Sequence, residues 1–349
     1  MQIDYIIVGF GLAGLALVEE LKAREKTFVV FEDASQTSSK VAGGMYNPVI
    51  LKRFTPVWDS EEQLAAALPF YERLEKKLQA KYDYKFPIYR VFKSVEEQNN
   101  WFVAADKPRL STHMKSQLNF ESHYGIPSEY GYGELQGTGR IDVSSLLEDY
   151  KQLLEEEGLL IKQTLDYEKL SIKDTFTYGK FNAKKVICCE GYGIKNNPYF
   201  KELPLIGSKG ELLVIRAPEL EIDFVLKGGV FVMPLGNNLF KVGATFNNTD
   251  KTIQPTEKGK TELIDKLNSV INVDFEVIEH YAGIRPTVKD RRPLLGAHPT
   301  VKHLYVFNGL GTRGVMIAPK YAQKLLEFIE EGKQLPKEVA ITRFDNRSR

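Results

Sequence analysis

The run over residues 6–32, IIVGFGLAGLALVEELKAREKTFVVFE, constrains the fold more than any other part of the chain. It predicts, in order, a strand over Ile6–Val8, the glycines Gly9, Gly11 and Gly14, a helix over Leu15–Arg24, a strand over Phe28–Phe31 and an acid at Glu32. A strand, a glycine-rich turn, a helix and a second strand in this spacing are typical of a βαβ unit that binds a dinucleotide. The alternative is a plain βα turn that binds no ligand, and such a turn does not require an acid at Glu32.

Each glycine has its own physical task in such a unit. Gly9 permits the tight turn after the strand, Gly11 lets the backbone approach a pyrophosphate, and Gly14 lets the helix pack closely on the sheet. The free N–H groups at the start of the helix attract phosphate. Glu32 would accept hydrogen bonds from ribose hydroxyls and would repel a 2′-phosphate, which disfavours NADP. We therefore predict cofactor contacts from Gly9, Phe10, Gly11, Leu12, Ala13, Gly14, Glu32 and Asp33.

Composition adds few limits beyond those of an ordinary globular protein. The 349 residues suffice for two domains, and the formal net charge of +1 gives no sign of a nucleic-acid or membrane surface. Cys188 and Cys189 are neighbours in a predicted strand, so a disulfide between them is not expected, and the five histidines lack metal-ligand spacing. No apolar run reaches membrane-spanning length, and the first strand begins near Ile3, which leaves no room for a signal peptide. We expect a cytoplasmic protein without a metal.

The remaining pattern alternates between helix-rich and strand-rich segments. Helices are predicted over residues 61–82 with a bend at Pro69, near 95–103, over 142–157 with Asp142 as N-cap, and over 314–331. Strands are predicted over 84–93, 186–189 and 304–307, and residues 211–282 read as strands separated by glycine and asparagine turns. This pattern predicts an α/β protein. A discontinuous Rossmann-like cofactor domain would occupy residues 1–83, 140–207 and 283–349, and an inserted antiparallel β-rich substrate domain would occupy residues 84–139 and 208–282.

Four further segments extend the pattern over the whole chain. They are residues 38–48 (SSKVAGGMYNP), 186–193 (VICCEGYG), 283–296 (GIRPTVKDRRPLLG) and 308–319 (NGLGTRGVMIAP). Together they resemble the D-amino-acid oxidase family of FAD-dependent amine oxidoreductases, which includes glycine oxidase and sarcosine oxidase. The resemblance implies an FAD-binding domain and an enzyme that oxidises a small amine or N-substituted amino acid.

The resemblance also implies roles for individual residues. FAD, expected to be non-covalent, would take a hydride equivalent from the carbon beside a neutral amine, and water would hydrolyse the imine. The N-terminus of the last helix would stabilise the negative charge of the reduced flavin. In the family, the arginine of the G-x-R-P segment pairs with the substrate carboxylate, which implies this role for Arg285; the alternative is a buried structural ion pair. The further cofactor contacts are Ser39, Gly44, Met45, Gly191, Gly283, Gly309, Leu310, Gly311, Thr312, Arg313, Gly314 and Val315.

Two positions depart from the glycine-oxidase pattern. Arg313 is the second candidate catalytic residue, as a carboxylate ligand, but the glycine-oxidase arginine aligns with Thr312 when counted from residues 318–319. Phe231 stands where glycine oxidase has a tyrosine, so a hydroxyl that would touch the carboxylate is missing. These departures argue against simple glycine or D-amino-acid specificity. Asp290 and Thr287 are interpreted as structural groups.

Other functions stay open at this point. Residues 43–48, 203–205 and 309–314 are also similar to the C-terminal oxidase domain of the bifunctional enzyme that modifies wobble uridine in tRNA, whose methyltransferase domain is not expected in this chain. A tRNA carrying carboxymethylaminomethyl-uridine is therefore an alternative substrate, which the near-neutral charge disfavours. The basic stretch over residues 76–85 is interpreted as a solvated helix end. An NAD-dependent dehydrogenase and an inactive flavin-binding protein are further alternatives, against which Arg285 and the last two segments argue.

Overall fold

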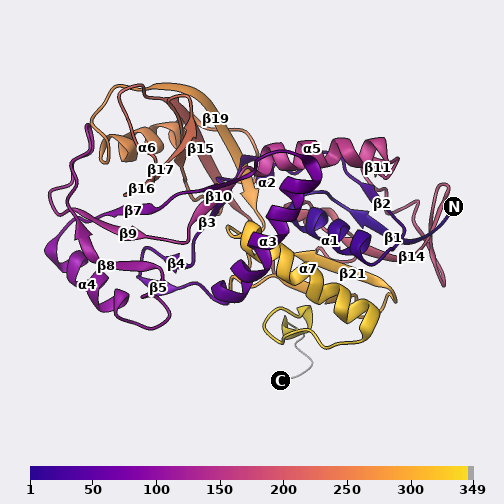
Figure 1. Ribbon diagram of the computed structural model, residues 1–349. Coiled ribbons are helices and arrows are strands. Elements are labelled where there is room, and N and C mark those ends of the chain that lie inside the picture. Colours follow the sequence, from indigo (N-terminus) through magenta and orange to yellow (C-terminus); the bar gives the residue numbers. More distant parts are fainter. Residues whose placement is uncertain (345–349) are drawn as a thin grey trace.

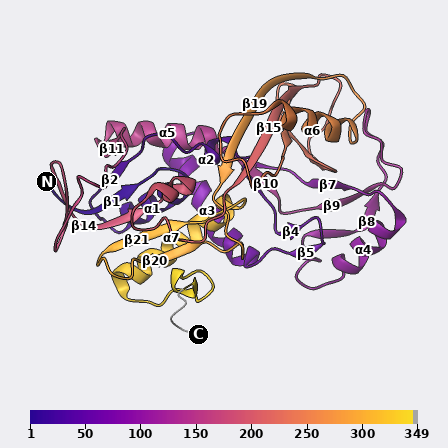
Figure 2. The ribbon, with the colours of Figure 1, turned by 180° about the vertical axis from the view of Figure 1, so that it is seen from behind.

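Two eight-stranded sheets form the two halves of the protein in the computed structural model, which describes residues 1–344 (Figure 1). One half carries β1, β2, β14 and β21 together with α1, α5 and α7, and the other carries β15 to β19, β7 to β9 and α6 (Figure 1, and from behind in Figure 2). Residues 345–349, the end of the last predicted cofactor segment, lie outside the described residues. No helix within residues 1–344 combines the length and the apolar character needed to span a membrane.

The first sheet, called here the β1 sheet, has the order β11-β2-β1-β14-β13-β12, with β21 beside β14 and β20 beside β21. Strands β11, β2, β1, β14 and β21 are parallel, whereas β12, β13 and β20 pair antiparallel. The bounds are β1 (Gln2–Val8), β2 (Phe28–Phe31), β11 (Leu160–Ile161), β12 (Ser171–Ile172), β13 (Phe176–Tyr178), β14 (Phe181–Cys188), β20 (Leu294–Ala297) and β21 (Leu304–Asn308).

Both faces of the β1 sheet are buried. Along β1, Tyr5 and Ile7 pack in the cluster that contains α1, α3, α5 and α7, while Ile6 and Val8 pack in a second cluster on the opposite face. Successive residues of a strand point to opposite faces, so a strand that is covered on both sides reads as a continuous apolar run. This explains the unbroken run of buried residues from Tyr5 to Val8 in β1.

The helices cover these sheets, and several of their ends were predicted. Their bounds are α1 (Leu12–Ala23), α2 (Ser38–Val41), α3 (Ser60–Leu78), α4 (Val95–Ala105), α5 (Val143–Glu156), α6 (Glu257–Asn268) and α7 (Gly314–Glu331), with 3₁₀ helices η1 (Gly191–Asn196) and η2 (Ile341–Phe344). The predicted cap of α5 is confirmed, because the Asp142 carboxylate accepts the Ser145 N–H at 3.3 Å. Helix α3 ends four residues earlier than predicted, at Leu78, where Gln79 adopts a left-handed conformation with φ 52°.

The second sheet, called here the β15 sheet, has the order β19-β15-β18-β17-β16-β7-β9-β8. Helix α6 packs Leu263 and Leu267 against one face, and the other face looks toward the β1 half. Its bounds are β7 (Ile88–Val91), β8 (Met114–Asn119), β9 (Tyr132–Leu135), β15 (Ser208–Arg216), β16 (Val225–Lys227), β17 (Phe231–Gly236), β18 (Leu239–Gly243) and β19 (Glu276–Arg285). Two small sheets join the halves: β3 (Met45–Tyr46), β10 (Gly139–Ile141) and β6 (Asp83–Lys85), and β4 (Val49–Ile50) with β5 (Thr55–Pro56).

Three details of the β15 half differ from the predicted pattern. The prediction of strands alone over residues 211–282 is wrong, since α6 lies within it. The sheet is not wholly antiparallel, because β16 and β7 are parallel neighbours. Strand β19 continues through Arg285, three residues beyond the predicted domain boundary at 282. The segment over residues 283–296 therefore begins inside the β15 sheet, and Arg285 is the last residue of β19.

Candidate active site

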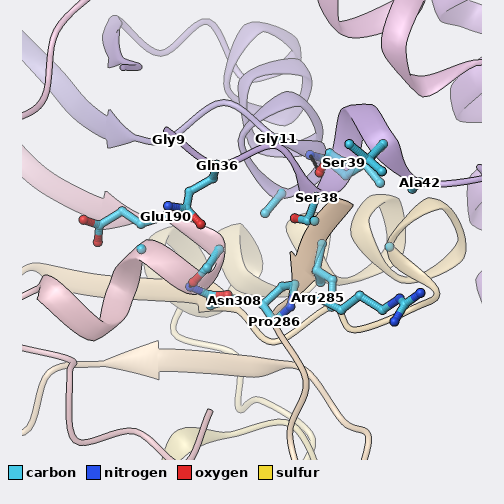
Figure 3. A pocket seen from close by; sticks show the side chains of 18 of the residues that line it. Gly9, Gly11, Gln36, Ser38, Ser39, Ala42, Glu190, Arg285, Pro286 and Asn308 are labelled. Carbon is cyan, nitrogen blue, oxygen red and sulfur yellow. Dashed lines mark hydrogen bonds between the residues drawn. The ribbon is translucent and has the colours of Figure 1, made fainter. Parts of the chain in front are cut away.

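A cavity of about 1100 Å³ lies between the two halves. On one side it is lined by the loops that follow β1, β2, β14 and β21, which end at the same edge of the parallel sheet. The carboxyl ends of parallel strands are where open α/β sheets bind ligands. On the other side it is lined by residues of β15 to β19. Figure 3 shows Glu190 and Gln36 toward one end of this cavity and Arg285 toward the other, with Gly11, Ser38 and Ser39 between them.

The first glycine turn is too tight for side chains. Gly9 has φ 93°, and a Cβ there would lie 2.7 Å from the Cys189 carbonyl oxygen. A Cβ at Gly14 would lie 2.3 Å from the Gly9 carbonyl oxygen. Gly11 is the N-cap of α1 and has no side chain to accept a hydrogen bond from the first turn, in which the Leu12 N–H is bonded to Ser39 Oγ at 3.4 Å. The first N–H groups of α1 therefore open into the cavity, where an anion can use them.

Glu32 follows β2 and is held in place from two sides. Its Oε2 accepts the Phe10 N–H at 2.7 Å, and its Oε1 accepts the ammonium of Lys151 on α5 at 2.8 Å. Each carboxylate oxygen keeps a further lone pair for a ligand hydroxyl. Asp33, the next residue, accepts hydrogen bonds from the Ser35 N–H at 2.9 Å and the Thr164 hydroxyl at 2.8 Å.

Three sequence segments meet around α2. Ser39 of α2 accepts the Leu12 N–H at 3.4 Å, and a Cβ at Gly11 would lie 2.9 Å from its Oγ. Gly44 has φ 67°, and a Cβ there would lie 1.9 Å from the Ile141 carbonyl oxygen. Met45 follows in β3 and lines the cavity. Gly11, Ser38 and Ser39 all line the cavity, so α2 and the first glycine turn form one continuous part of its wall.

The segment over residues 308–319 leads from β21 into α7. The Asn308 side chain accepts the Gly309 N–H at 2.7 Å and donates to the Gly191 carbonyl at 2.9 Å, which joins this segment to η1. Helix α7 begins at Gly314 with Arg313 as N-cap and no side-chain cap, whereas α4, α5 and α6 are capped by Ser94, Asp142 and Thr256. A second helix N-terminus thus opens into the cavity.

Most of the predicted cofactor residues line the cavity. Gly14 and Gly309 do not line it; a Cβ at Gly14 would meet the Gly9 carbonyl oxygen, and a Cβ at Gly309 would meet the Val288 side chain. The predicted residues that line it are Gly9, Phe10, Gly11, Leu12, Ala13, Glu32, Asp33, Ser39, Gly44, Met45, Gly191, Gly283, Leu310, Gly311, Thr312, Arg313, Gly314 and Val315.

Arg285 lies at the end of β19 and folds across β15. A Cβ at Gly210 of β15 would lie 1.8 Å from one of its guanidinium nitrogens, so the position of the guanidinium requires glycine there. The same group donates to the Thr245 carbonyl at 3.2 Å and lies 4.5 Å from the centre of the Phe246 ring. Burial lowers the pKa of Arg285 to about 10, which leaves it cationic at neutral pH. No carboxylate within residues 1–344 lies within 4.0 Å of it, so the predicted alternative of a buried structural ion pair is not present there.

Arg313 is a second cation on the cavity wall. It is half-buried, and burial together with the charges of Arg291 and Arg292 lowers its pKa. Within the described part of the chain it also has no carboxylate partner closer than 4.0 Å. Thr312, the position that aligns with the glycine-oxidase arginine, is exposed. The cavity therefore presents two arginines whose charge the described residues do not neutralise.

The opposite end of the cavity contains a polar group that sequence patterns did not single out. Glu190 accepts a hydrogen bond from the Asn197 side chain at 2.6 Å, and the Asn197 side chain also donates to the Tyr167 hydroxyl at 2.8 Å. Burial raises the pKa of Glu190 to about 7. Other residues missed were Lys151, Gln36, Gly210 and Lys227, because nothing local in the sequence marks them. Among residues 1–344, no group of three or more histidine, cysteine, aspartate or glutamate side chains is arranged to hold a metal ion.

The sequence as a whole matches a known family. The model of the DAO family, described as FAD dependent oxidoreductase, matches residues 4–327. The chain belongs to the DAO family of FAD-dependent oxidoreductases. It is therefore an enzyme with FAD as its cofactor, and the alternatives of an NAD-dependent dehydrogenase and an inactive flavin-binding protein are set aside.

Individual relatives are distant. The glycine oxidase of Pseudomonas aeruginosa is 20% identical, over 93% of this chain and 94% of that protein. The tRNA 5-methylaminomethyl-2-thiouridine biosynthesis bifunctional protein MnmC of Marinobacter nauticus is 21% identical, over 93% of this chain but only 55% of that protein. The chain thus spans about half the length of the bifunctional relatives that it matches. The crystal structure of glycine oxidase from Geobacillus kaustophilus aligns with a TM-score of 0.76 at 20% identity, over 96% of each chain, which supports the fold.

The cavity fits FAD. Its volume exceeds the range of about 300–1,000 Å³ that is usual for a drug-sized ligand. Two helix N-termini without side-chain caps open into it, at Gly11 and Arg313, and the glycine turn at Gly9 and Gly11 leaves the backbone bare for a close ligand. When bound, FAD supplies an electron sink, which no side chain of the chain can provide.

Proposed function

We propose that the enzyme oxidises the C–N bond of a small secondary amine or N-substituted amino acid that carries a carboxylate. The observation that carries the proposal is Arg285, a cation without a carboxylate partner among residues 1–344, held across Gly210 in the same cavity as the start of α7. A planar guanidinium binds a carboxylate through two parallel hydrogen bonds. In this position it would hold the substrate by its carboxylate.

The proposed reaction needs little acid–base machinery. FAD, when bound, would supply a two-electron acceptor, so that the carbon beside a neutral amine nitrogen could lose a hydride equivalent and the nitrogen a proton, with formation of a C=N bond. Water then hydrolyses the imine to an amine and a carbonyl product. The chain contributes orientation through Arg285 and, in our proposal, charge stabilisation through the N–H groups at the start of α7. Glu32 and the start of α1 would hold the ribose and the pyrophosphate of the cofactor.

The similar structures support an amine substrate. Among them are glycine oxidase from Geobacillus kaustophilus, iminodiacetate oxidase from Chelativorans and L-proline dehydrogenase from P. horikoshii. Each of these names a compound with an amine nitrogen close to a carboxylate. Phe231 lines the cavity of this chain without a hydroxyl, and we propose that it favours a substrate with an N-substituent over free glycine.

A second candidate is the oxidation of carboxymethylaminomethyl-uridine in tRNA. Phe246 lines the cavity and is 70% exposed, and an exposed aromatic ring can stack on a nucleobase. The match to MnmC covers 93% of this chain. The net charge of +1 disfavours this candidate, since binding of nucleic acid usually draws on a basic surface.

An absorption spectrum followed by a substrate panel tests both candidates. The purified protein is mixed anaerobically with glycine, sarcosine, D-alanine, D-proline, iminodiacetate and tRNA carrying carboxymethylaminomethyl-uridine. Bleaching of the flavin absorbance by sarcosine or iminodiacetate supports the first candidate, and bleaching by the tRNA alone supports the second. A flavoprotein that no carboxylate-bearing amine reduces contradicts the proposed function and leaves the family assignment in place.

A further inference from the structure

Lys227 lies on the cavity wall, several strands away from Arg285. It ends β16, and its direct partner across the antiparallel pair is Phe231 of β17. Directly paired residues on neighbouring strands share one face of a sheet, and both residues line the cavity. The chain reverses between them through Gly228, Gly229 and Val230, and Val230 packs in the cluster that contains Leu263 and Leu267 of α6.

The ammonium of Lys227 lacks a counter-charge. Within residues 1–344 no carboxylate lies within 4.0 Å of it, and its hydrogen-bond acceptor is the Gly228 carbonyl at 3.2 Å. The charged groups that act on it are the cations Arg90, Lys266 and Lys93. Arg90, its partner on β7, is paired with Glu97, and Lys266 of α6 is paired with Glu262, so their carboxylates are already engaged. A half-buried cation in such surroundings is stabilised by an anion that enters from the cavity.

The two cations face the cavity from different strands. In the order β19-β15-β18-β17-β16, Lys227 and Arg285 are four strands apart, which is roughly 19 Å across the sheet at about 4.8 Å per strand. Arg285 also lies further along β19 than Tyr281, the residue of that strand in the row of Lys227. Arg285 shortens this gap because it folds back across Gly210 of β15. The wall between them is made of Phe231, Gly243 and Leu212, which pair in one row across the sheet and offer no charge.

We propose that Lys227 binds a second anionic group of the substrate, so that the preferred substrate is a secondary amine with one carboxylate beside the reacting carbon and another at the far end of its N-substituent. This inference rests on the proposed function and names its substrate class. Arg285 holds the near carboxylate, the apolar row contacts the linking methylene groups, and Lys227 holds the distal carboxylate. Burial lowers the pKa of Lys227 to about 8, so most of it is cationic at pH 7.

The test compares two substrates that differ only in distal charge. N-(3-carboxypropyl)glycine and N-(3-carbamoylpropyl)glycine are oxidised by the wild-type holoenzyme and by Lys227→Met, Lys227→Arg and Lys93→Met. Lys93 is an exposed cation near Lys227, so Lys93→Met is the matched control for a general loss of positive charge. Binding is measured separately through the flavin absorbance, with the non-oxidisable thioether 4-(carboxymethylthio)butanoate and its distal amide.

We expect wild type to prefer the carboxylate substrate by about 10- to 100-fold in kcat/KM, the range of one charged hydrogen bond. The preference should fall to near one in Lys227→Met, persist in Lys93→Met, and be partly kept in Lys227→Arg. The same preference in wild type and Lys227→Met, or none in wild type, overturns the inference. If wild type oxidises neither amine nor sarcosine, the proposed function fails, and the thioether titration still decides whether Lys227 binds the distal carboxylate.

Discussion

Gly210→Ala is the sharpest test of how Arg285 is positioned. Gly210 has no side chain, and the Arg285 guanidinium fills the space above it: an added Cβ would lie 1.8, 2.1 and 2.3 Å from three of its heavy atoms. Ordinary contact requires about 3.5–4.0 Å, so the guanidinium has to retreat by about 2 Å. Because these atoms end a flexible side chain, the side chain can move and the sheet can stay intact.

A displacement of this size separates the guanidinium from a bound carboxylate. Charged hydrogen bonds of this kind have lengths of about 2.7–2.9 Å, and they are lost once the atoms lie beyond about 3.5 Å. The loss of one such bond costs about 1.5–3 kcal/mol, which corresponds to roughly a 10- to 150-fold decrease in kcat/KM. Removal of the whole side chain in Arg285→Ala should cost more, about 2–5 kcal/mol.

The assay measures kcat/KM with whichever carboxylate-bearing amine bleaches the flavin, together with the flavin spectrum and the melting temperature. Gly229→Ala is the matched control, because its new Cβ would have Ser269 Oγ as nearest atom, at an ordinary 3.8 Å. Gly229 also lines the cavity beside Lys227, so the control is measured with a substrate that has no distal carboxylate, for which kcat/KM should stay close to wild type. In the Arg285→Ala background, Gly210→Ala should cause no further loss, because its effect acts through Arg285. A Gly210→Ala variant with wild-type kcat/KM, or additive losses in the double variant, would refute the reasoning.

Four further changes have defined outcomes. Arg285→Ala should keep bound flavin and sharply raise KM for carboxylate-bearing amines, whereas an unchanged KM removes Arg285 from the substrate site. Gly14→Ala should weaken FAD binding and lower the melting temperature, since its Cβ would lie 2.3 Å from the Gly9 carbonyl oxygen; retention of both properties contradicts this. Burial raises the pKa of Glu190 to about 7 from 4.5, so the folded state binds more protons than the unfolded state between these values. The free energy of unfolding should therefore fall as pH rises through this window, by up to about 3 kcal/mol, and Glu190→Gln should flatten that slope in thermal melts. The distal-carboxylate preference should decline above pH about 8 as Lys227 loses its proton, and a preference constant to pH 9.5 would argue against its role.

Much of the fold could be predicted because its signals are local. The strand, turn and helix at the N-terminus, the cap at Asp142 and the final helix depend on residues within one or two turns of one another. Helix α6 was missed although Thr256 caps it by accepting the Gly259 N–H at 3.0 Å and Leu263 and Leu267 have helical spacing. The strands before and after α6 have a stronger sequence pattern, β-branched and aromatic residues in alternation, than the helix has. Strand β8 was missed because its sequence, MKSQLN, is too polar to show alternation.

The residues on the cofactor side of the candidate site could also be predicted, because their signals are local in the sequence. Glycines that permit a tight turn carry their signal in their spacing, and the residues beside them follow from the chain itself. The pairs that the sequence did not reveal join distant segments: Lys151 reaches Glu32 from α5, and Asn308 reaches Gly191. Such pairs depend on which helix packs on which strand, and no periodic pattern in a single sequence predicts that packing.

The substrate side depends almost wholly on sheet register. Gly210 and Arg285 are far apart in the chain, and they meet because Gly210 pairs with Gly283 while Arg285 leans back across β15. A shift by one residue would turn Arg285 to the opposite face of the sheet and place it among the residues that pack on α6. Lys227 reaches the cavity through the same kind of pairing, with Phe231. The family motif therefore marks the arginine, but the register of β15 to β19 decides what the arginine and the lysine can hold between them.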